Sequence, residues 1–149
     1  MGDKSKFALG IIITMFATAL ILRGIDYYAK NGSVEIGGKI FKTEVVSNDW
    51  DMNRGLSGRA GLKNNAGMLF VFSKADFQIF WMKDMKFPID IIWINEGKIV
   101  DIQEKAPVPI TQYIESYRPS EIAKYVLEIN GGLVEKYGFK IGDRVELDI

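Results

Sequence analysis

Two charged residues, Lys83 and Asp90, flank a proline that separates two apolar stretches of the sequence. Lys83 follows the first stretch, where its ammonium group could hold an anionic ligand or could simply be solvated. Asp90 opens the second stretch and, in strict strand alternation, shares a face with apolar residues. Because a carboxylate on an apolar face needs a partner, Asp90 is either in a structural ion pair with Lys83 or Arg59, or a ligand-binding or acid–base group.

Glu128 and Asn130 form a second polar pair, two residues apart and therefore on the same side of a predicted strand. Together with Asp90 they could form an oxygen-rich cluster that binds a polar ligand such as a sugar, or weakly binds a hard metal ion. The structural alternative is that Asn130 caps the following helix and Glu128 pairs with an arginine. Arg59 follows a glycine-containing turn and could clamp a carboxylate or phosphate, or could tie its loop to the domain.

Trp81 stands two residues before Lys83, and its ring could be a stacking platform for a sugar. The structural alternative is that Trp81, Met68 and Met82 belong to the hydrophobic core, as large apolar residues of alternating strands usually do. Methionine alone is a weak signal for a soft metal when cysteine and histidine are absent. We therefore expect no metal ion and no cofactor.

The composition excludes several kinds of chemistry. The 149 residues include no cysteine and no histidine, which excludes disulfides, thiol catalysis, a Ser-His-Asp triad and a zinc hydrolase. Nineteen basic residues balance nineteen acidic ones, so the chain has no electrostatic footprint for nucleic acid. The remaining catalytic options are carboxylates, lysine, tyrosine, serine activated by lysine, or a hard-metal site of oxygen ligands.

Residues 7–22 form an uncharged apolar run of sixteen residues, preceded by Lys4 and Lys6. As a helix it would span roughly 24 Å, short of the ~30 Å hydrocarbon core, but Arg23 can snorkel toward the lipid headgroups. This pattern predicts that residues 1–29 contain an uncleaved signal anchor and that the domain lies outside the cytoplasm. The alternatives are a cleavable signal peptide, with Ala-Thr-Ala at 17–19 and a secreted or periplasmic product, or a buried core helix.

Residues 30–149 predict one β-rich globular domain. Short apolar stretches are separated by turn residues, which is typical of a mainly β, jelly-roll-like sandwich or barrel with short helices. Two glycines at 37–38 indicate a tight hairpin. Short helices are predicted from Asn48 or Asp49 to Arg54, and before Gly138. The predicted strands are 33–36, 39–46, 67–72, 77–82, 90–94, 98–104, 125–130 and 144–149.

Several sequence blocks in one fixed order carry a family resemblance. They are Arg54-Gly55-Leu56, Arg59, Gly67–Phe72, Phe80–Lys83, Pro88–Ile92, Ala123–Gly131 and Gly142–Val145. Over roughly residues 34–149 the chain resembles the domain of unknown function 192 family. The resemblance implies a compact, jelly-roll-like or barrel-like β domain, often exported behind an N-terminal apolar segment, and no established activity. Two departures are Ser57, where the family usually has methionine, and Asp84-Met85, which replaces a typical Asn-Thr beside Lys83.

Three functions follow as hypotheses. The first is a membrane-anchored extracytoplasmic binding module for a small polar or anionic ligand, for example an envelope glycan. The second is an enzyme acting on an envelope component, with Asp90 or Glu128 as acid or base and Lys83 as electrostatic partner. The third is a structural accessory of an envelope complex. Both site hypotheses require Lys83, Asp90 and Glu128 to converge in one pocket. The candidate ligand-binding residues are Lys83, Asp90, Arg59, Glu128, Asn130 and Trp81.

Overall fold

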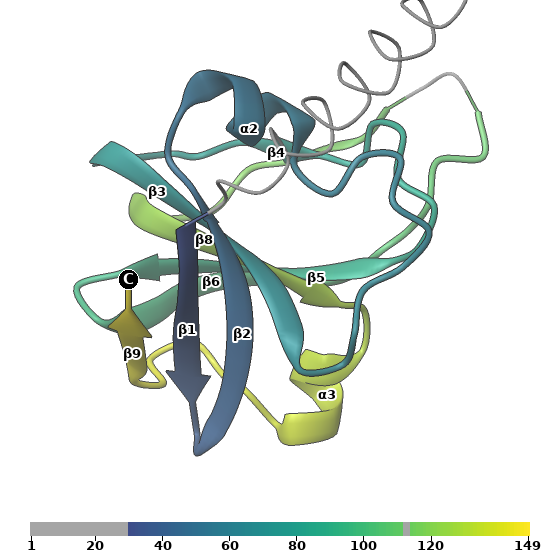
Figure 1. The fold of residues 1–149 in the computed structure, drawn as a ribbon. Coiled ribbons are helices and arrows are strands. Elements are labelled where there is room, and N and C mark those ends of the chain that lie inside the picture. The colour runs from purple at the N-terminus through teal and green to yellow at the C-terminus, as the bar shows by residue number, and fades with distance from the viewer. Residues whose placement is uncertain (1–29, 112–113) are drawn as a thin grey trace, which may run out of the picture.

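A seven-stranded sheet dominates the computed structural model, which describes residues 30–111 and 114–149 (Figure 1). The strand order is β6-β5-β8-β3-β2-β1-β9, with β2 and β3 parallel and every other neighbouring pair antiparallel. The prediction of a mainly β domain is confirmed. The strands of this sheet are β1 Lys30–Ile36, β2 Lys39–Val46, β3 Ala66–Asp76, β5 Ile89–Asn95, β6 Lys98–Ala106, β8 Ala123–Asn130 and β9 Val145–Asp148.

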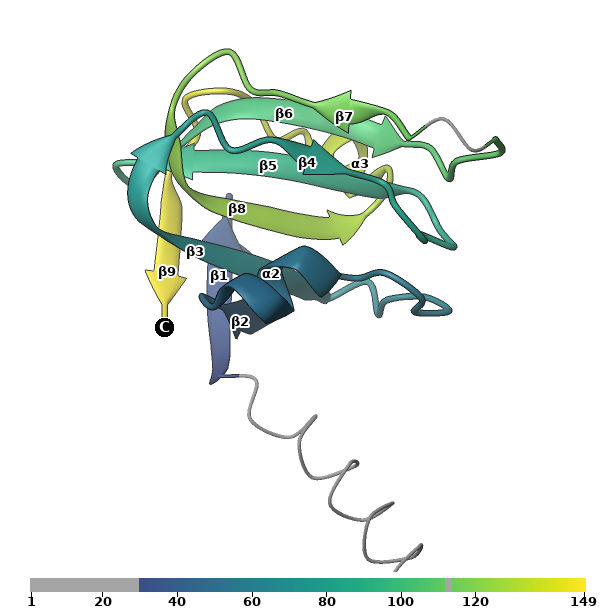
Figure 2. The same cartoon turned by 90° about the horizontal axis from the view of Figure 1, so that it is seen from above.

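The sheet curls into a half-barrel, and its two edge strands meet at one end (Figures 1 and 2). The backbone N–H of Ile99 donates to the carbonyl of Asp143 at 3.0 Å, and that of Val145 donates to Gly97 at 2.8 Å. These bonds join the start of β6 to the start of β9. The hairpin between β1 and β2 turns at Gly37 and Gly38, whose φ angles of 55° and 75° are easily adopted only by glycine.

Alternate residues of the central strands supply two separate hydrophobic cores. The core inside the curl includes Leu69, Ile92 and Leu127, which are fully buried. We call this side of the sheet the inner face. The core on the opposite side, the outer face, includes Phe70 and Trp93. Since successive side chains of a strand point to opposite faces, each central strand serves both cores, which explains why β5 is apolar at nearly every position.

Two short elements cover the outer face. Helix α2, Asp49–Arg54, begins at Asn48, whose side chain accepts a hydrogen bond from the Asp51 N–H at 2.9 Å. A two-stranded sheet of β4, Phe80–Trp81, and β7, Ser116–Tyr117, lies farther along the same face (Figure 2). Both ends of α2 agree with the sequence-based expectation. The predicted strand over 77–82 is in fact limited to the two residues of β4.

Helix α3, Leu133–Tyr137, closes the inner face from the side of β8 (Figure 1). It ends at Gly138, whose left-handed φ of 72° lets its N–H reach the Val134 carbonyl, as predicted for a helix end at this glycine. Within residues 30–111 and 114–149, none of the helices has the length and apolar character needed to cross a membrane. The predicted signal anchor lies outside the described residues.

Candidate functional site

Asp90 lies on the inner face and is completely buried. Its Oδ1 accepts hydrogen bonds from the backbone N–H of Lys105 at 2.7 Å and of Gly132 at 2.9 Å. Its Oδ2 accepts one from the N–H of Val134 at 2.8 Å. Because all three donors are backbone groups of β6 and of the start of α3, this carboxylate caps the helix and ties it to the sheet. Asp90 is therefore a structural group, and its predicted ion pair with Lys83 or Arg59 is wrong.

Glu128 lies on the other side of the sheet from Asp90. The two residues occupy neighbouring strands: Asp90 is opposite Ile129, whereas Ile91 is opposite Glu128. That offset of one position sends the two side chains to opposite faces. The predicted oxygen-rich cluster of Asp90 with Glu128 and Asn130 is consequently wrong. Across the described part of the chain, no group of three or more metal-ligating side chains comes together.

The Glu128 side chain is buried beneath the outer layer, with 4% of the residue exposed. Its Oε2 has no hydrogen-bond partner among the described residues. Burial raises the pKa of this carboxyl from 4.5 to about 8, an effect that the positive charge of Arg59 partly offsets. A buried carboxyl group with unused hydrogen-bonding capacity is costly, and a bound molecule could satisfy it.

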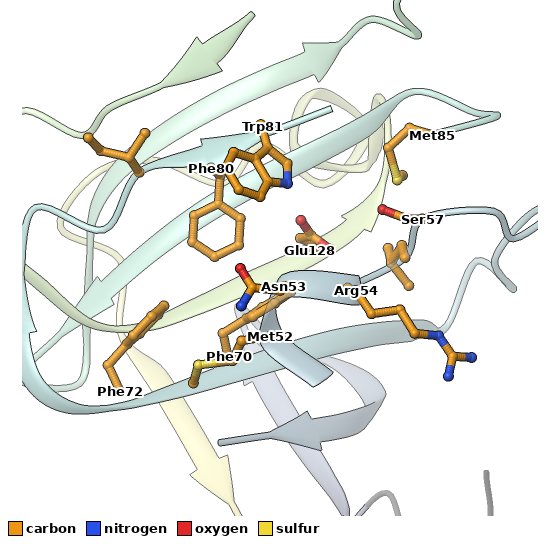
Figure 3. Close-up of a pocket in the computed structure, with 13 residues that line it drawn as sticks. Met52, Asn53, Arg54, Ser57, Phe70, Phe72, Phe80, Trp81, Met85 and Glu128 are labelled. Carbon is orange, nitrogen blue, oxygen red and sulfur yellow. The ribbon is translucent and has the colours of Figure 1, made fainter. Parts of the chain in front are cut away.

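The Glu128 carboxyl group lines a cavity of about 150 Å³ between α2 and β4, which we call the Glu128 cavity (Figure 3). Its floor is formed by the central strands, and its walls combine aromatic and aliphatic side chains with the polar side chains of Asn53, Arg54 and Ser57. Of the predicted candidates, Glu128 and Trp81 line it. The lining residues are Met52, Asn53, Arg54, Gly55, Leu56, Ser57, Phe70, Phe72, Ile79, Phe80, Trp81, Met85 and Glu128.

The end of α2 brings the backbone close to the Glu128 carboxyl. Gly55 has φ 48° and ψ −133°, a conformation open mainly to glycine. A Cβ atom at this position would lie 3.4 Å from the Phe70 ring and 3.9 Å from Glu128 Oε2. The next residue, Leu56, is 1% exposed and anchors the chain in the outer core. A side chain would thus find ordinary contact distances here, and it is the backbone conformation of Gly55 that lets the chain turn into the roof of the cavity.

Two hydrogen bonds join the loop after Gly55 to the turn after β4. The Ser57 hydroxyl donates to the Lys83 carbonyl at 2.8 Å, and the Gly58 N–H donates to the Asp84 carbonyl at 2.9 Å. Asp84 has a positive φ of 56°, which turns the chain at this point. These bonds use only the main chain of Lys83, whose side chain is exposed and does not line the cavity. The predicted convergence of Lys83 with Glu128 and Asp90 is therefore not found.

Aromatic rings pack edge to face along one wall of the cavity. The Phe70 and Phe80 ring centroids are 4.8 Å apart at an interplanar angle of 89°, and Phe72 and Trp93 also meet Phe80 nearly perpendicularly. Phe80 is buried, whereas Trp81 is 50% exposed at the edge of the cavity. The interpretation of Trp81 as a core residue is therefore wrong, because β4 lies at the surface and its alternate residues face inward and outward.

Arg59 and Asn130 position loops around the site. The Arg59 guanidinium forms a two-pronged ion pair with Glu44 of β2, with Nη2 2.7 Å from Oε2. The Asn130 amide donates to the Leu62 carbonyl at 2.7 Å and to Asn64 Oδ1 at 3.1 Å. Asn130 thus holds the 62–64 loop and does not cap α3, whose N-cap is Gly132, two positions later. Neither side chain lines the cavity.

Sequence reasoning missed the contribution of α2 to the cavity. Met52, Asn53 and Arg54 line it from the helix, and Met85 lines it from the turn after β4. The available signal was Gly55, because a glycine directly after a helix indicates an unusual backbone conformation. Only the fold shows that this turn stands above Glu128, which is 73 positions farther along the sequence.

Comparison with known proteins identifies a family and similar solved structures. The family model of DUF192, described as "Uncharacterized ACR", matches residues 32–147. A protein of unknown function from Novosphingobium aromaticivorans DSM 12444 is 31% identical, with 78% of this chain and 83% of that chain covered and a TM-score of 0.67. A putative transcription regulator from Sinorhizobium meliloti 1021 is 30% identical, with 78% and 91% covered and a TM-score of 0.67. The search of curated proteins found no match.

Proposed function

The chain belongs to the DUF192 family, and we propose that its β domain is a binding module for a small ligand with an apolar body and one polar group. The observation that carries the proposal is the buried Glu128 carboxyl, with its Oε2 unpartnered among the described residues, in the lining of a cavity that also has aromatic and aliphatic walls. Ligand sites commonly combine apolar walls with a few precisely placed polar groups. A ligand that hydrogen-bonds to Glu128 would recover the free energy lost by burying this group without a partner.

The charges around the cavity favour a polar ligand over the anionic one considered from the sequence. Lys83 is outside the cavity, and Arg59 is paired with Glu44. Arg54 lines the cavity, but its side chain extends away from Glu128 (Figure 3). An anion next to Glu128 would therefore face a carboxyl group at close range without an opposing cation beside it.

The proposal includes a location outside the cytoplasm, with the chain tethered to a membrane. It is supported by the sixteen-residue uncharged run at 7–22 and its flanking lysines. The alternative is release by cleavage of a signal peptide. Protease treatment of intact and of permeabilised cells tests the location: a domain digested only after permeabilisation of the inner membrane would contradict it.

Mass spectrometry of small molecules that co-purify with the full chain tests the binding function. The comparison is between the wild type, Glu128→Gln, and the matched control Glu121→Gln, which removes an exposed carboxylate outside the cavity. We expect one species to be present in the wild type and in the control, and depleted in Glu128→Gln. Equal contents in all three folded proteins would remove the cavity as a binding site and favour a structural accessory role.

A second candidate function is acid–base catalysis by Glu128. It is favoured by the burial that raises the pKa of this carboxyl to about 8, because a group that titrates near neutral pH can both donate and accept a proton. Catalysis needs a second group that acts on the substrate, and the polar side chains available in the lining are Asn53, Arg54 and Ser57. Chemical conversion of the co-purified species by the wild type, absent in Glu128→Gln, would favour this function over binding.

A further inference from the structure

We propose that the ligand of the Glu128 cavity is a small organic cation, whose ammonium group binds the Glu128 carboxyl group while its apolar body lies against the aromatic wall. This inference rests on the binding function proposed above and specifies the ligand class. It goes beyond that function because a cavity with aromatic walls and one carboxyl group could also hold a neutral molecule or an organic acid.

The aromatic lining is the first argument. Phe70, Phe72, Phe80 and Trp81 all line the cavity that also contains the Glu128 carboxyl (Figure 3). The faces of aromatic rings carry a partial negative charge and attract ammonium groups, more strongly when the contact is shielded from water. A carboxyl group surrounded by aromatic rings therefore presents two kinds of cation-binding group to the same ligand.

Cavity size is the second argument, and it separates an organic cation from a metal ion. A cavity of about 150 Å³ is similar to one known to hold a molecule the size of benzene. A hard metal ion needs several oxygen ligands, and the lining supplies a single carboxylate, from Glu128. The space and the ligand set thus suit an amine attached to a ring or to a short aliphatic chain.

Proton balance is the third argument. The charge that acts on Glu128 is that of Arg59, which forms an ion pair with Glu44 of β2. Arg54 of α2 also lines the cavity, but its side chain extends away from Glu128. The strands on either side present apolar Met68 and Ile91 opposite Glu128. At neutral pH the carboxyl of the empty cavity is mostly protonated, because burial raises its pKa to about 8. An arriving ammonium ion keeps its own proton, displaces the Glu128 proton to solvent and pairs with the resulting carboxylate.

This exchange fixes the sign of the pH dependence. Below pH 8 each binding event releases close to one proton, so affinity for a cation should increase about tenfold per pH unit and level off above pH 8. An organic acid would show the opposite trend, because it can only share the proton of neutral Glu128. A neutral molecule would bind best below pH 8 or show little dependence.

Three probes of nearly equal shape test the inference: benzylammonium, benzyl alcohol and benzoate. Their binding to the full chain is measured by titration calorimetry at pH 6, 7 and 8, in two buffers of different ionisation enthalpy that together count the released protons. We expect benzylammonium to bind at least tenfold more tightly than the other two at pH 8. Its affinity should rise by about 50-fold between pH 6 and pH 8, with nearly one proton released at pH 6.

Three variants sharpen the result. Glu128→Gln should lose at least tenfold in benzylammonium affinity at pH 8 and lose the pH dependence, whereas Glu121→Gln should behave as the wild type. Arg54→Gln should leave the benzylammonium affinity within about twofold of the wild type, because the Arg54 side chain extends away from Glu128. Near-ultraviolet circular dichroism shows whether each variant retains its packing.

The outcomes distinguish failure of the ligand class from failure of the binding function. Benzoate bound more tightly at low pH and weakened in Arg54→Gln would overturn the cation assignment and leave a binding module for acids. Equal affinities for benzylammonium and benzyl alcohol would also overturn it. If none of the three probes binds and no co-purifying species depends on Glu128, the binding function itself fails.

Discussion

Asp90 and Glu128 are buried carboxyl groups on neighbouring strands, and they have opposite roles. Asp90 accepts three backbone hydrogen bonds on the inner face and holds α3 against the sheet. Glu128 lies on the outer face, leaves Oε2 without a partner among the described residues and faces a cavity. Both carboxyl groups are thus buried, and they differ in how many of their hydrogen-bonding positions are occupied. The carboxyl group with unmet hydrogen-bonding capacity is the one that indicates a site.

The largest effect is expected from Asp90→Ala. The change leaves three buried backbone N–H groups without an acceptor, each costing roughly 1–3 kcal/mol, so the free energy of unfolding should fall by roughly 3–9 kcal/mol. Urea denaturation measures this loss. Since the total stability of such domains is about 5–15 kcal/mol, this variant is expected to be close to unfolding at room temperature.

Asp90→Asn provides the milder test of the same contacts. One amide oxygen can still serve Lys105 and Gly132, whereas the donor at Val134 loses its acceptor, which should cost about 1–3 kcal/mol. Ordinary surface substitutions change stability by up to about 0.5 kcal/mol. If both Asp90 variants stay within that range, Asp90 does not hold the helix.

The second prediction is that Glu128→Gln increases the free energy of unfolding, whereas the Asp90 variants decrease it. Between pH 4.5 and about 8 the unfolded chain ionises Glu128 while the folded chain keeps it protonated, so wild-type stability decreases as the pH rises. The variant lacks this group, and its advantage should grow from near zero below pH 4.5 to at most about 5 kcal/mol above pH 8. Denaturation curves at pH 4.5, 6 and 8 measure the difference. A variant less stable than the wild type at pH 8 would show that the carboxylate is paired there.

The contrast between the two carboxyl groups also shows what the sequence can predict. Alternation placed Asp90 with Ile92 and Ile94, and Glu128 with Asn130, and the structure confirms both assignments. The hairpin at 37–38, the bounds of α2 and the end of α3 were also predictable, because glycines and a capping asparagine specify them locally.

Relations between strands were not predictable in the same way. Whether Asp90 and Glu128 share a face depends on strand register, and a shift of one residue reverses it. The partners of Asp90 are backbone N–H groups, which every residue except proline has, so residue types gave no signal for them. The Glu128 cavity depends on α2 and β4 covering the outer face, which is a tertiary arrangement.

The third prediction concerns Arg59, whose charge reaches Glu128 but whose ion pair is with Glu44. Arg59→Gln should raise the pKa of Glu128 further above its ordinary value, because the offsetting positive charge is removed. Stability should fall by up to about 1 kcal/mol, since the ion pair is partly exposed. Carbon-13 NMR of the glutamate carboxyl groups measures the pKa. Glu44→Gln is the matched control: it breaks the same ion pair but retains the Arg59 charge, so an equal upward shift there would contradict the argument.

The smallest effect on stability is expected from removing the Lys83 side chain. Removing the hydrogen bond to the Lys83 carbonyl should have a larger effect. Lys83→Ala should change stability by less than about 0.5 kcal/mol and leave the ligand content unchanged, because the exposed side chain does not line the cavity. Ser57→Ala instead removes the hydroxyl that donates to the Lys83 carbonyl, and should cost about 1 kcal/mol. Urea denaturation and mass spectrometry of bound species measure both variants. Loss of ligand in Lys83→Ala alone would show that the Lys83 ammonium group contacts the ligand, because the backbone contact stays intact in that protein. It would then favour an anionic ligand.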